Sequence, residues 1–361
     1  MSLENLRKNL SSVDKQLVET IAKRQEIVSQ IGEFKRSSGT GTRDYAREKD
    51  VLNMGRKQAE DLGVDPDLIE AFLKLLIQAS LESQERERVA AEGKGDGSRV
   101  LIIGGAGKMG QWFVDFFNSQ GYAVTIADTS VKNSSNSFTS WKDAGLNFEF
   151  IVIATPLAIS GRILEELAIS KPDGLIFDIG SLKSPLICGL EKLKKAGCSV
   201  TSLHPMFGPE TRLLSDHHLI FCDVGDHAAT ATVKKLFSST MVKQLDMGLD
   251  DHDRLIAYVL GLSHALNIAF FTALAESGEK APLLAKMSST TFDSQLLVST
   301  AVAKDNPHLY FEIQKLNKFG LGSIDALCDA VFKIRKTIED DNEEAFIELM
   351  KSGRDYLSLR E

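Results

Sequence analysis

The sequence predicts a chain of three parts: an all-α unit, an α/β domain built on a parallel sheet, and a second all-α unit. Apolar residues at helical spacing fill the first 90 positions, a glycine-rich turn follows a continuous apolar run near residue 100, and residues 250–357 are again almost wholly helical in pattern. The length of 361 residues suits two or three domains. We expect boundaries at 1–90, a linker at 91–98, an α/β domain at 99–247 and helices at 248–361.

Three helices are predicted in the first part. Apolar residues recur at steps of three, four and seven from Leu3 to Ile31, which predicts a helix over about residues 3–35. A second helix is expected over 43–63. Pro66 fits the first turn of a third helix, which should end near residue 88.

Charged and amide side chains interrupt these apolar rows in a way that a small bundle does not need. They are Arg7, Arg24, Lys35, Asp44, Glu48 and Gln84. Their cations indicate a site for a small dianion, although charged residues on helices more often form solvated faces. Arg7 and Arg24 would be roughly 25 Å apart on one helix. If both serve one site they come from different chains, which predicts an intertwined dimer.

These six positions, with Ser80 as a seventh, resemble the all-helical chorismate mutases that are fused to aromatic-pathway enzymes of bacteria. The resemblance covers about residues 3–88. It implies that Arg7 of one chain and Arg24 of the other hold the two carboxylates of chorismate. A pericyclic rearrangement transfers no proton, so the reaction needs only a preorganised cationic cradle.

The same resemblance implies roles for the remaining side chains of this set. Lys35 and Gln84 are expected to face the ether oxygen of chorismate. Glu48 is expected to hold the ring hydroxyl together with the backbone near Asp44.

A dinucleotide fingerprint begins the second part. The apolar run 99–103 leads into Gly105, Gly107 and Gly110, with Lys108 and Met109 between the last two glycines, and a helical pattern follows. A second strand over 123–127 ends at Asp128. This order predicts a Rossmann domain whose glycines allow a tight turn and a close approach of the pyrophosphate. Asp128, unless it is only a turn residue, should bind the ribose hydroxyls and so favour NAD over NADP.

Further strands are expected over 150–154, 175–178 and 199–202, each followed by a polar motif. The motifs are Thr155-Pro156, Gly180-Ser181-Leu182-Lys183 and His204-Pro205-Met206-Phe207-Gly208-Pro209. Open α/β sheets bind ligands at the carboxyl ends of their strands, so the three motifs are expected at one site, with Thr155 beside the cofactor.

The segment after His204, together with the Gly-Ser-x-Lys loop, resembles the prephenate dehydrogenases from about residue 99 to the C-terminus. The resemblance implies a C-terminal dimerisation domain and an NAD-dependent oxidative decarboxylation. His204 would accept a hydrogen bond or the proton from the ring hydroxyl, with Ser181 in support, and an imidazole with a pKa near neutrality suits that task. Lys183 and His264 belong to the same pattern.

One position departs from that family. An arginine that usually clamps the substrate carboxylate is replaced by Ala301, and Asp293 stands where a second arginine is common; Lys304 offers only a point charge. Two alternatives therefore stay open. The substrate could be a 4-amino analogue, or the C-terminal part could bind NAD and an aromatic ligand for regulation without turnover.

Composition narrows the possible partners. A net charge of -8 with a pI near 5.5 argues against nucleic-acid and membrane partners. The four cysteines have no paired spacing that implies disulfides or zinc. We see no signal peptide or transmembrane run and expect a cytoplasmic homodimer acting on chorismate and prephenate. The acidic residues 339–344 are expected to form a solvated turn between helices.

Overall fold

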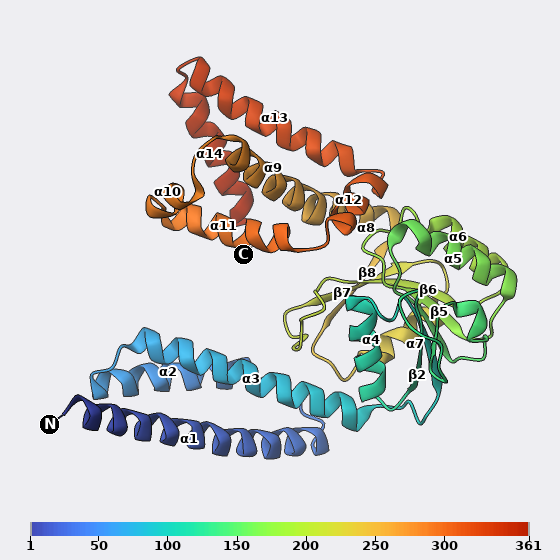
Figure 1. Cartoon of the computed structure of the whole chain (residues 1–361), viewed down its shortest axis with the longest axis horizontal. Helices are drawn as coiled ribbons and strands as arrows, with labels where there is room; N and C mark the ends of the chain where they lie inside the picture. The colour runs from blue at the N-terminus through green and yellow to red at the C-terminus, as the bar shows by residue number, and fades with distance from the viewer. Residues whose placement is uncertain (1, 360–361) are drawn as a thin grey trace.

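A computed structural model describes residues 2–359 of the chain. Figure 1 shows three bodies: an N-terminal layer of long helices, a central sheet domain, and a C-terminal group of helices that leaves the sheet domain separately. Both helical bodies extend to the same side of the sheet domain in this view, and the sheet domain joins them.

The N-terminal body consists of α1 (Leu3–Ser37), α2 (Tyr45–Leu62) and α3 (Pro66–Glu92). Side chains cap each helix at its start: Ser2 for α1, Asp44 for α2 and Asp65 for α3. Gly63, with φ of 67°, ends α2 in the left-handed conformation that glycine adopts without strain. The expected helices are thus confirmed, and α3 continues four residues further than expected, into the predicted linker.

The connection after α3 is not a flexible spacer. The backbone N–H of Gly95 donates to the Gln120 carbonyl at 2.9 Å, and that of Gly97 donates to the Gly121 carbonyl at 2.9 Å. A Cβ added at Gly95 would lie 2.4 Å from the backbone nitrogen of Tyr122. Close packing against the sheet domain therefore requires Gly95, whereas the φ of 78° at Gly97 favours glycine there.

Within the described residues, the central domain carries an eight-stranded sheet in the order β3-β2-β1-β4-β5-β6-β7-β8. The pair β6 and β7 is antiparallel and β8 is parallel to β7, so these last two strands run opposite to the others. The strands are β1 (Arg99–Ile103), β2 (Ala123–Ala127), β3 (Ser137–Phe138), β4 (Phe150–Ile153), β5 (Leu175–Asp178), β6 (Val200–Pro205), β7 (His218–Asp223) and β8 (Lys243–Gly248). The helices are α4 (Lys108–Ser119), α5 (Leu157–Ser170), α6 (Ile187–Lys195) and α7 (His227–Leu236), with a short 3₁₀ turn at Trp141–Asp143. The predicted Rossmann fold is confirmed, while β3, β7 and β8 were not predicted.

Alternate residues of the central strands pack against opposite faces of this sheet. In β1, Val100 and Ile102 join the aromatic cluster around Phe113 and Phe117, on the face covered by α4 and α7. Leu101 and Ile103 join the aliphatic cluster on the face covered by α5 and α6. Burial on both faces explains why these strands appear in the sequence as continuous apolar runs.

The C-terminal body is a chain of helices: α8 (Leu249–Ile256), a π-helical segment (Ala257–Leu262), α9 (Ser263–Glu276), α10 (Ala281–Lys286), α11 (Thr290–Lys304), α12 (Pro307–Leu316), α13 (Gly320–Glu339) and α14 (Glu343–Ser358). The acidic residues 339–344 do connect two helices, with Asn342 capping α14.

The continuous helical stretch Leu249–Glu276 is long and apolar enough to cross a membrane by those two criteria alone, with a mean hydropathy of 1.6 over its most apolar window. The expectation that no such run exists was therefore wrong for this stretch. Its first turns nevertheless contain His252 and Asp253, which are fully buried against the sheet domain and hydrogen-bonded there. These contacts bury the start of the stretch, whereas 22% of its most apolar window is buried.

Two candidate active sites

Arg24 of α1 meets Ser80 of α3 in the N-terminal body. One nitrogen of its guanidinium, Nη1, donates to Ser80 Oγ at 2.5 Å and to the Leu76 carbonyl at 3.1 Å. Partial burial lowers the pKa of Arg24. The hydrogen bonds fix the direction of the guanidinium and leave its other nitrogens for a ligand.

Lys35 and Gln84 line one small hollow beside Thr42. Lys35 Nζ donates to the Thr42 carbonyl at 2.6 Å, and Gln84 Nε2 donates to the Val28 carbonyl at 3.3 Å. Gly32 makes room for this arrangement, because a Cβ there would lie 3.1 Å from Gln84 Cγ. The two predicted side chains are therefore adjacent although they belong to different helices.

Two arginines in the same hollow were not predicted. Arg36 and Arg88 line it together with Lys35; Arg36 Nη1 is buried and lies 3.5 Å from Glu87 Oε2, and Arg88 Nε lies 2.8 Å from Glu92 Oε1. A signal was present in the sequence: Arg36 follows Lys35 directly, and Arg88 lies one helical turn beyond Gln84. Three cationic side chains therefore line the hollow, and carboxylates pair with its two arginines.

Glu48 and Asp44 have different surroundings. Both carboxylate oxygens of Glu48 accept from Arg43, Oε1 from Nε at 3.0 Å and Oε2 from Nη2 at 3.2 Å. Asp44 precedes α2 and accepts from the backbone N–H of Arg47 at 3.0 Å as its N-cap. Asp44 therefore caps α2 from outside, although the helix predicted over residues 43–63 included it.

Arg7 remains apart from the other predicted residues of this site. It lies on α1 seventeen positions before Arg24, and it is exposed. Around it, Leu3, Leu6, Leu10 and Val13 are also exposed, with 49% to 63% of their surface accessible. A single chain therefore presents Arg24 without Arg7, together with an uncovered apolar helix face.

The glycine-rich turn in the central domain follows β1 as predicted. Gly104 has φ of 87°, and a Cβ there would lie 2.5 Å from the Ala154 carbonyl oxygen. A Cβ at Gly105 would lie 2.7 Å from Ile126 Cγ2, and one at Gly110 would lie 2.2 Å from the Gly104 carbonyl oxygen. Gly104 was not in the predicted fingerprint, yet it is the residue that turns the chain.

A dinucleotide fits this turn. Gly107 is the N-cap of α4 and makes no side-chain cap, so the first backbone N–H groups of α4, in the turn containing Lys108 and Met109, face outward for a phosphate. Asp128 Oδ2 accepts from the Ala106 N–H at 3.2 Å, and its Oδ1 accepts from the Ser130 N–H at 2.9 Å. The carboxylate thus lies beside the turn, where ribose hydroxyls are expected.

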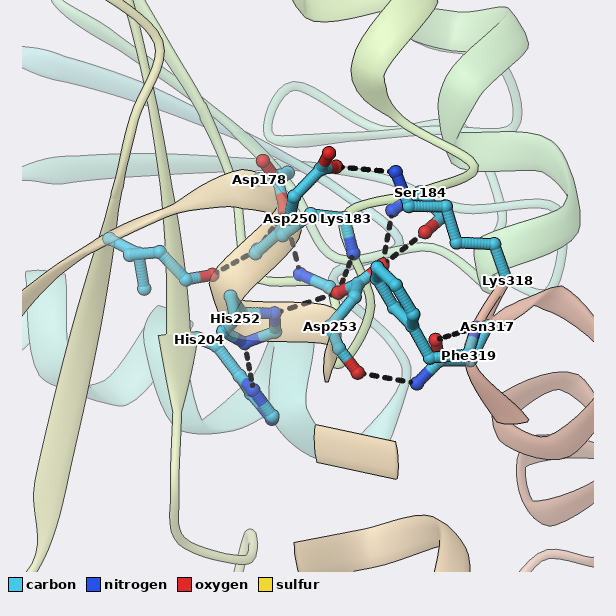
Figure 2. Close-up of polar contacts among 12 residues, drawn as sticks. Asp178, Lys183, Ser184, His204, Asp250, His252, Asp253, Asn317, Lys318 and Phe319 are labelled. Carbon is cyan, nitrogen blue, oxygen red and sulfur yellow. Dashed lines mark hydrogen bonds and ion pairs between the residues drawn. The ribbon is translucent and has the colours of Figure 1, made fainter. Parts of the chain in front are cut away.

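His204 lies in β6 and is hydrogen-bonded to a residue 48 positions later. Its Nδ1 lies 2.9 Å from His252 Nε2, and His252 Nδ1 lies 2.8 Å from Asp253 Oδ1. Figure 2 shows His252 lying between His204 and the carboxylate of Asp253. His252 and Asp253 belong to α8, so the C-terminal body completes a site that starts on the sheet.

The hydrogen bonds determine which ring nitrogens carry protons. Asp253 accepts from the backbone N–H groups of Lys183 at 2.8 Å and Ser184 at 2.6 Å, and these bonds help to lower its pKa despite burial. An ionised Asp253 requires a proton on His252 Nδ1. His252 Nε2 then accepts from His204 Nδ1, and His204 Nε2 is left with its lone pair.

Burial changes the titration of both histidines. Desolvation lowers the pKa of His204 well below 6.5, and the charges of His252 and Lys183 act in the same direction. Burial also lowers the pKa of His252, against the opposing effect of Asp253. The expected pKa near neutrality for His204 is therefore wrong, and the imidazole is neutral at physiological pH.

Lys183 is enclosed within the sheet domain. Its side chain is fully buried, and Nζ is 2.7 Å from Asp178 Oδ1 and donates to the Leu203 carbonyl at 2.8 Å. Its ammonium therefore supports the loop between β5 and α6 and adds positive potential behind His204. Ser181, two positions earlier in the same loop, is partly buried.

His264 lies in α9, beyond the π-helical segment that sequence reasoning did not predict. Its ring packs edge-on against Tyr310 of α12 with centroids 4.1 Å apart, and burial lowers its pKa to about 4. His264 Nδ1 is buried without a hydrogen-bond partner among the described residues. Such an atom is a candidate contact for a substrate. Thr155, by contrast, shares a hydrogen bond with Ser160 at 2.8 Å.

Three family models match the chain in succession. Residues 6–85 match chorismate mutase type II, residues 123–245 the nucleotide-binding domain of prephenate dehydrogenase, and residues 249–352 the dimerisation domain of prephenate dehydrogenase. The order of these matches agrees with the three bodies of the structure.

Relatives with both parts cover nearly the whole chain. The T-protein of Enterobacter agglomerans is 28% identical over 345 residues, which are 96% of this chain and 90% of that protein. The T-protein of Haemophilus influenzae is 25% identical over 360 residues, with 98% and 92% covered. The crystal structure of a prephenate dehydrogenase from A. aeolicus in complex with hydroxyphenyl propionate and NAD+ has a TM-score of 0.59 at 21% identity, covering 73% of this chain and 98% of that one. At that identity the likeness shows the fold.

Proposed function

Because this chain joins a type II chorismate mutase to an NAD-dependent prephenate dehydrogenase of tyrosine biosynthesis, we propose that the residues described above carry the two reactions at two separate sites. Chorismate is rearranged to prephenate in the N-terminal body. Prephenate is then oxidised and decarboxylated to 4-hydroxyphenylpyruvate between the sheet and the C-terminal helices. A cytoplasmic location is part of this proposal.

The mutase site is completed by a second copy of the chain. Arg24, held by Ser80, binds one carboxylate of chorismate, and Arg7 of the partner subunit binds the other. Lys35 and Gln84 face the ether oxygen and stabilise the charge that develops there. The exposed apolar rows of α1 support this dimer, because covering them is the main gain available to the helix.

In the dehydrogenase site the chain's residues hold the cofactor and handle one proton. The turn containing Gly105, Gly107 and Gly110 receives the pyrophosphate, with Asp128 on the ribose. Bound NAD supplies the hydride acceptor. His204 Nε2 accepts the proton of the ring hydroxyl, and Ser181 supports that contact.

One observation carries the assignment of His204 as the base: the hydrogen-bonded chain from Asp253 through His252 to His204. It fixes the tautomer in which Nε2 of His204 has a free lone pair. It also holds the ring in one orientation, so no rotational freedom is lost when the substrate arrives.

Asp253→Asn tests this assignment. An asparagine whose amide nitrogen takes the place of Oδ1 loses the hydrogen bond from the Lys183 N–H and donates to His252 Nδ1, which reverses both tautomers and puts a proton on His204 Nε2. We expect prephenate turnover to fall on the order of a hundredfold or more, approaching the loss of about two to four orders of magnitude for His204→Asn. Mutase activity should stay unchanged.

Ser184→Ala is the matched control, since Ser184 Oγ also donates to Asp253 but does not set the tautomer. It should retain most of the turnover. Near-normal turnover of Asp253→Asn would contradict the proposed relay from Asp253 through His252 to His204.

A second experiment tests which substrate the dehydrogenase site accepts, since the clamping arginine is replaced by Ala301, which is exposed on α11. The rate of NADH formation by the wild type is compared between prephenate and its 4-amino analogue.

A further inference from the structure

The mutase body is attached to the sheet domain by a buried carboxylate. Glu85 of α3 is 3% exposed and accepts from the backbone N–H of Leu214 at 2.7 Å and from that of Met241. Burial raises the pKa of Glu85, and the two amide hydrogen bonds oppose that rise. Glu85 is the neighbour of Gln84, so this attachment lies directly behind the mutase site.

A second attachment involves the arginine that holds Glu48. Arg43 uses Nε and Nη2 for the two oxygens of Glu48, and its Nη1 donates to Ser215 Oγ and Asp216 Oδ2 of the sheet domain. The guanidinium also stacks over the Tyr45 ring at 4.3 Å. The carboxylates of Glu48 and Asp216 together raise the pKa of Arg43. One guanidinium therefore connects a mutase side chain to the dehydrogenase domain.

Leu214, Ser215 and Asp216 belong to the segment 206–217, which follows His204 directly. The same segment is fixed to α4, because Trp112 Nε1 donates to the Thr211 carbonyl at 3.0 Å. Glu85 and Arg43 thus contact a segment that the dehydrogenase domain holds in place. Arg43 and Asp216 line a cavity of about 300 Å³ between the two domains, so their charges are partly screened by solvent.

We propose that Asp216 of the dehydrogenase domain is a positioning residue for the mutase reaction, acting through Arg43 on the carboxylate of Glu48. The inference rests on the proposed contact of Glu48 with the ring hydroxyl of chorismate. The hydrogen bond to Asp216 restricts the rotamers of Arg43. Arg43 in turn holds the carboxylate of Glu48 in one orientation before the substrate binds.

The test uses full-length variants and the ratio of mutase to dehydrogenase turnover in one preparation, which cancels differences in the amount of folded protein. Asp216 has φ of 66°, so Asp216→Gly removes the carboxylate without straining the backbone, and Asp216→Asn keeps one oxygen acceptor in a conformation that asparagine tolerates. We expect Asp216→Gly to lower the ratio about three- to tenfold, with Asp216→Asn intermediate.

Asp246→Ala is the control for loss of a surface charge in the same domain, because Asp246 pairs with Lys234 within the sheet domain; it should leave the ratio unchanged. Combining Asp216→Gly with Arg43→Gln should lower the ratio no further than Arg43→Gln alone. The inference is wrong if the losses of the two single variants multiply in the double variant, or if Asp216→Gly leaves the ratio unchanged.

Glu48→Gln separates this inference from the proposed function on which it rests. If Glu48→Gln lowers mutase turnover while Asp216→Gly does not, only the positioning role of Asp216 is wrong. If Glu48→Gln has no effect, the assigned role of Glu48 fails first and the inference fails with it.

Discussion

Helix α1 and strand β1 show two ways of burying apolar residues. Leu10, Val13 and Val18 of α1 are 60% to 65% exposed in the single chain, whereas Val100 and Leu101 of β1 are completely buried. The sheet domain covers its strands with its own helices. The N-terminal body has two other helices, and only α3 packs along α1 to a substantial extent.

The difference extends to the active sites. The dehydrogenase relay of Asp253, His252 and His204 is complete within one chain, because α8 folds back onto the sheet. The mutase cradle contains Arg24 but not Arg7. The two regions therefore differ in the same way in packing and in their sites. The sheet domain buries its strands within one chain, and the dehydrogenase relay is also complete within one chain. Helix α1 needs a second chain to cover its apolar face, and the mutase site needs a second chain to supply Arg7.

Arg24→Ala is the substitution expected to change the mutase most. Removing a cation that faces a desolvated carboxylate should cost on the order of 3 kcal/mol or more of transition-state binding, which is a loss above a hundredfold. Dehydrogenase activity with prephenate should persist, because the hydrogen bonds of Arg24 are made to α3 within the N-terminal body. Both activities are measured on one folded preparation, and an equal loss of both would show that the two sites are not independent.

A smaller effect is expected from pH. His204 must be neutral to accept a proton, and burial lowers its pKa well below 6.5. The neutral fraction therefore persists as the pH falls through 6.5, and kcat/KM for prephenate should begin to fall only at lower pH. The acid limb of the pH profile measures this directly. A limb centred above 6.5 would mean that the relay raises the basicity of His204 more than burial reduces it.

Local patterns in the sequence predicted most of the fold. The spacing of apolar residues located α1 to α3, and the order of strand, glycines, helix and Asp128 located the cofactor turn, because each depends on neighbours within a few residues. The strands β7 and β8 were missed, and so was the π-helical segment before His264. These elements depend on pairing or packing with residues distant in sequence.

The candidate sites show the same limit. His204 was found from its motif, but its hydrogen bond joins it to His252, 48 positions later, and local sequence patterns do not show which distant residues meet. Lys183 was expected at the site because of its motif, and only the fold shows that Asp178 holds its ammonium. The bridge from Arg43 to Asp216 joins two domains and could not be inferred from either one.

Mixing of inactive variants tests the central claim, that the mutase site is shared between chains while the dehydrogenase relay is not. Arg7→Ala and Arg24→Ala are combined under conditions of subunit exchange. Half of the dimers should then be hybrids with one site that contains both arginines, so roughly a quarter of wild-type mutase activity should return. A mixture of His204→Asn and Asp253→Asn should recover no dehydrogenase activity, because both residues act within one chain. The account is contradicted if demonstrated hybrids of the first pair stay inactive, or if the second pair recovers.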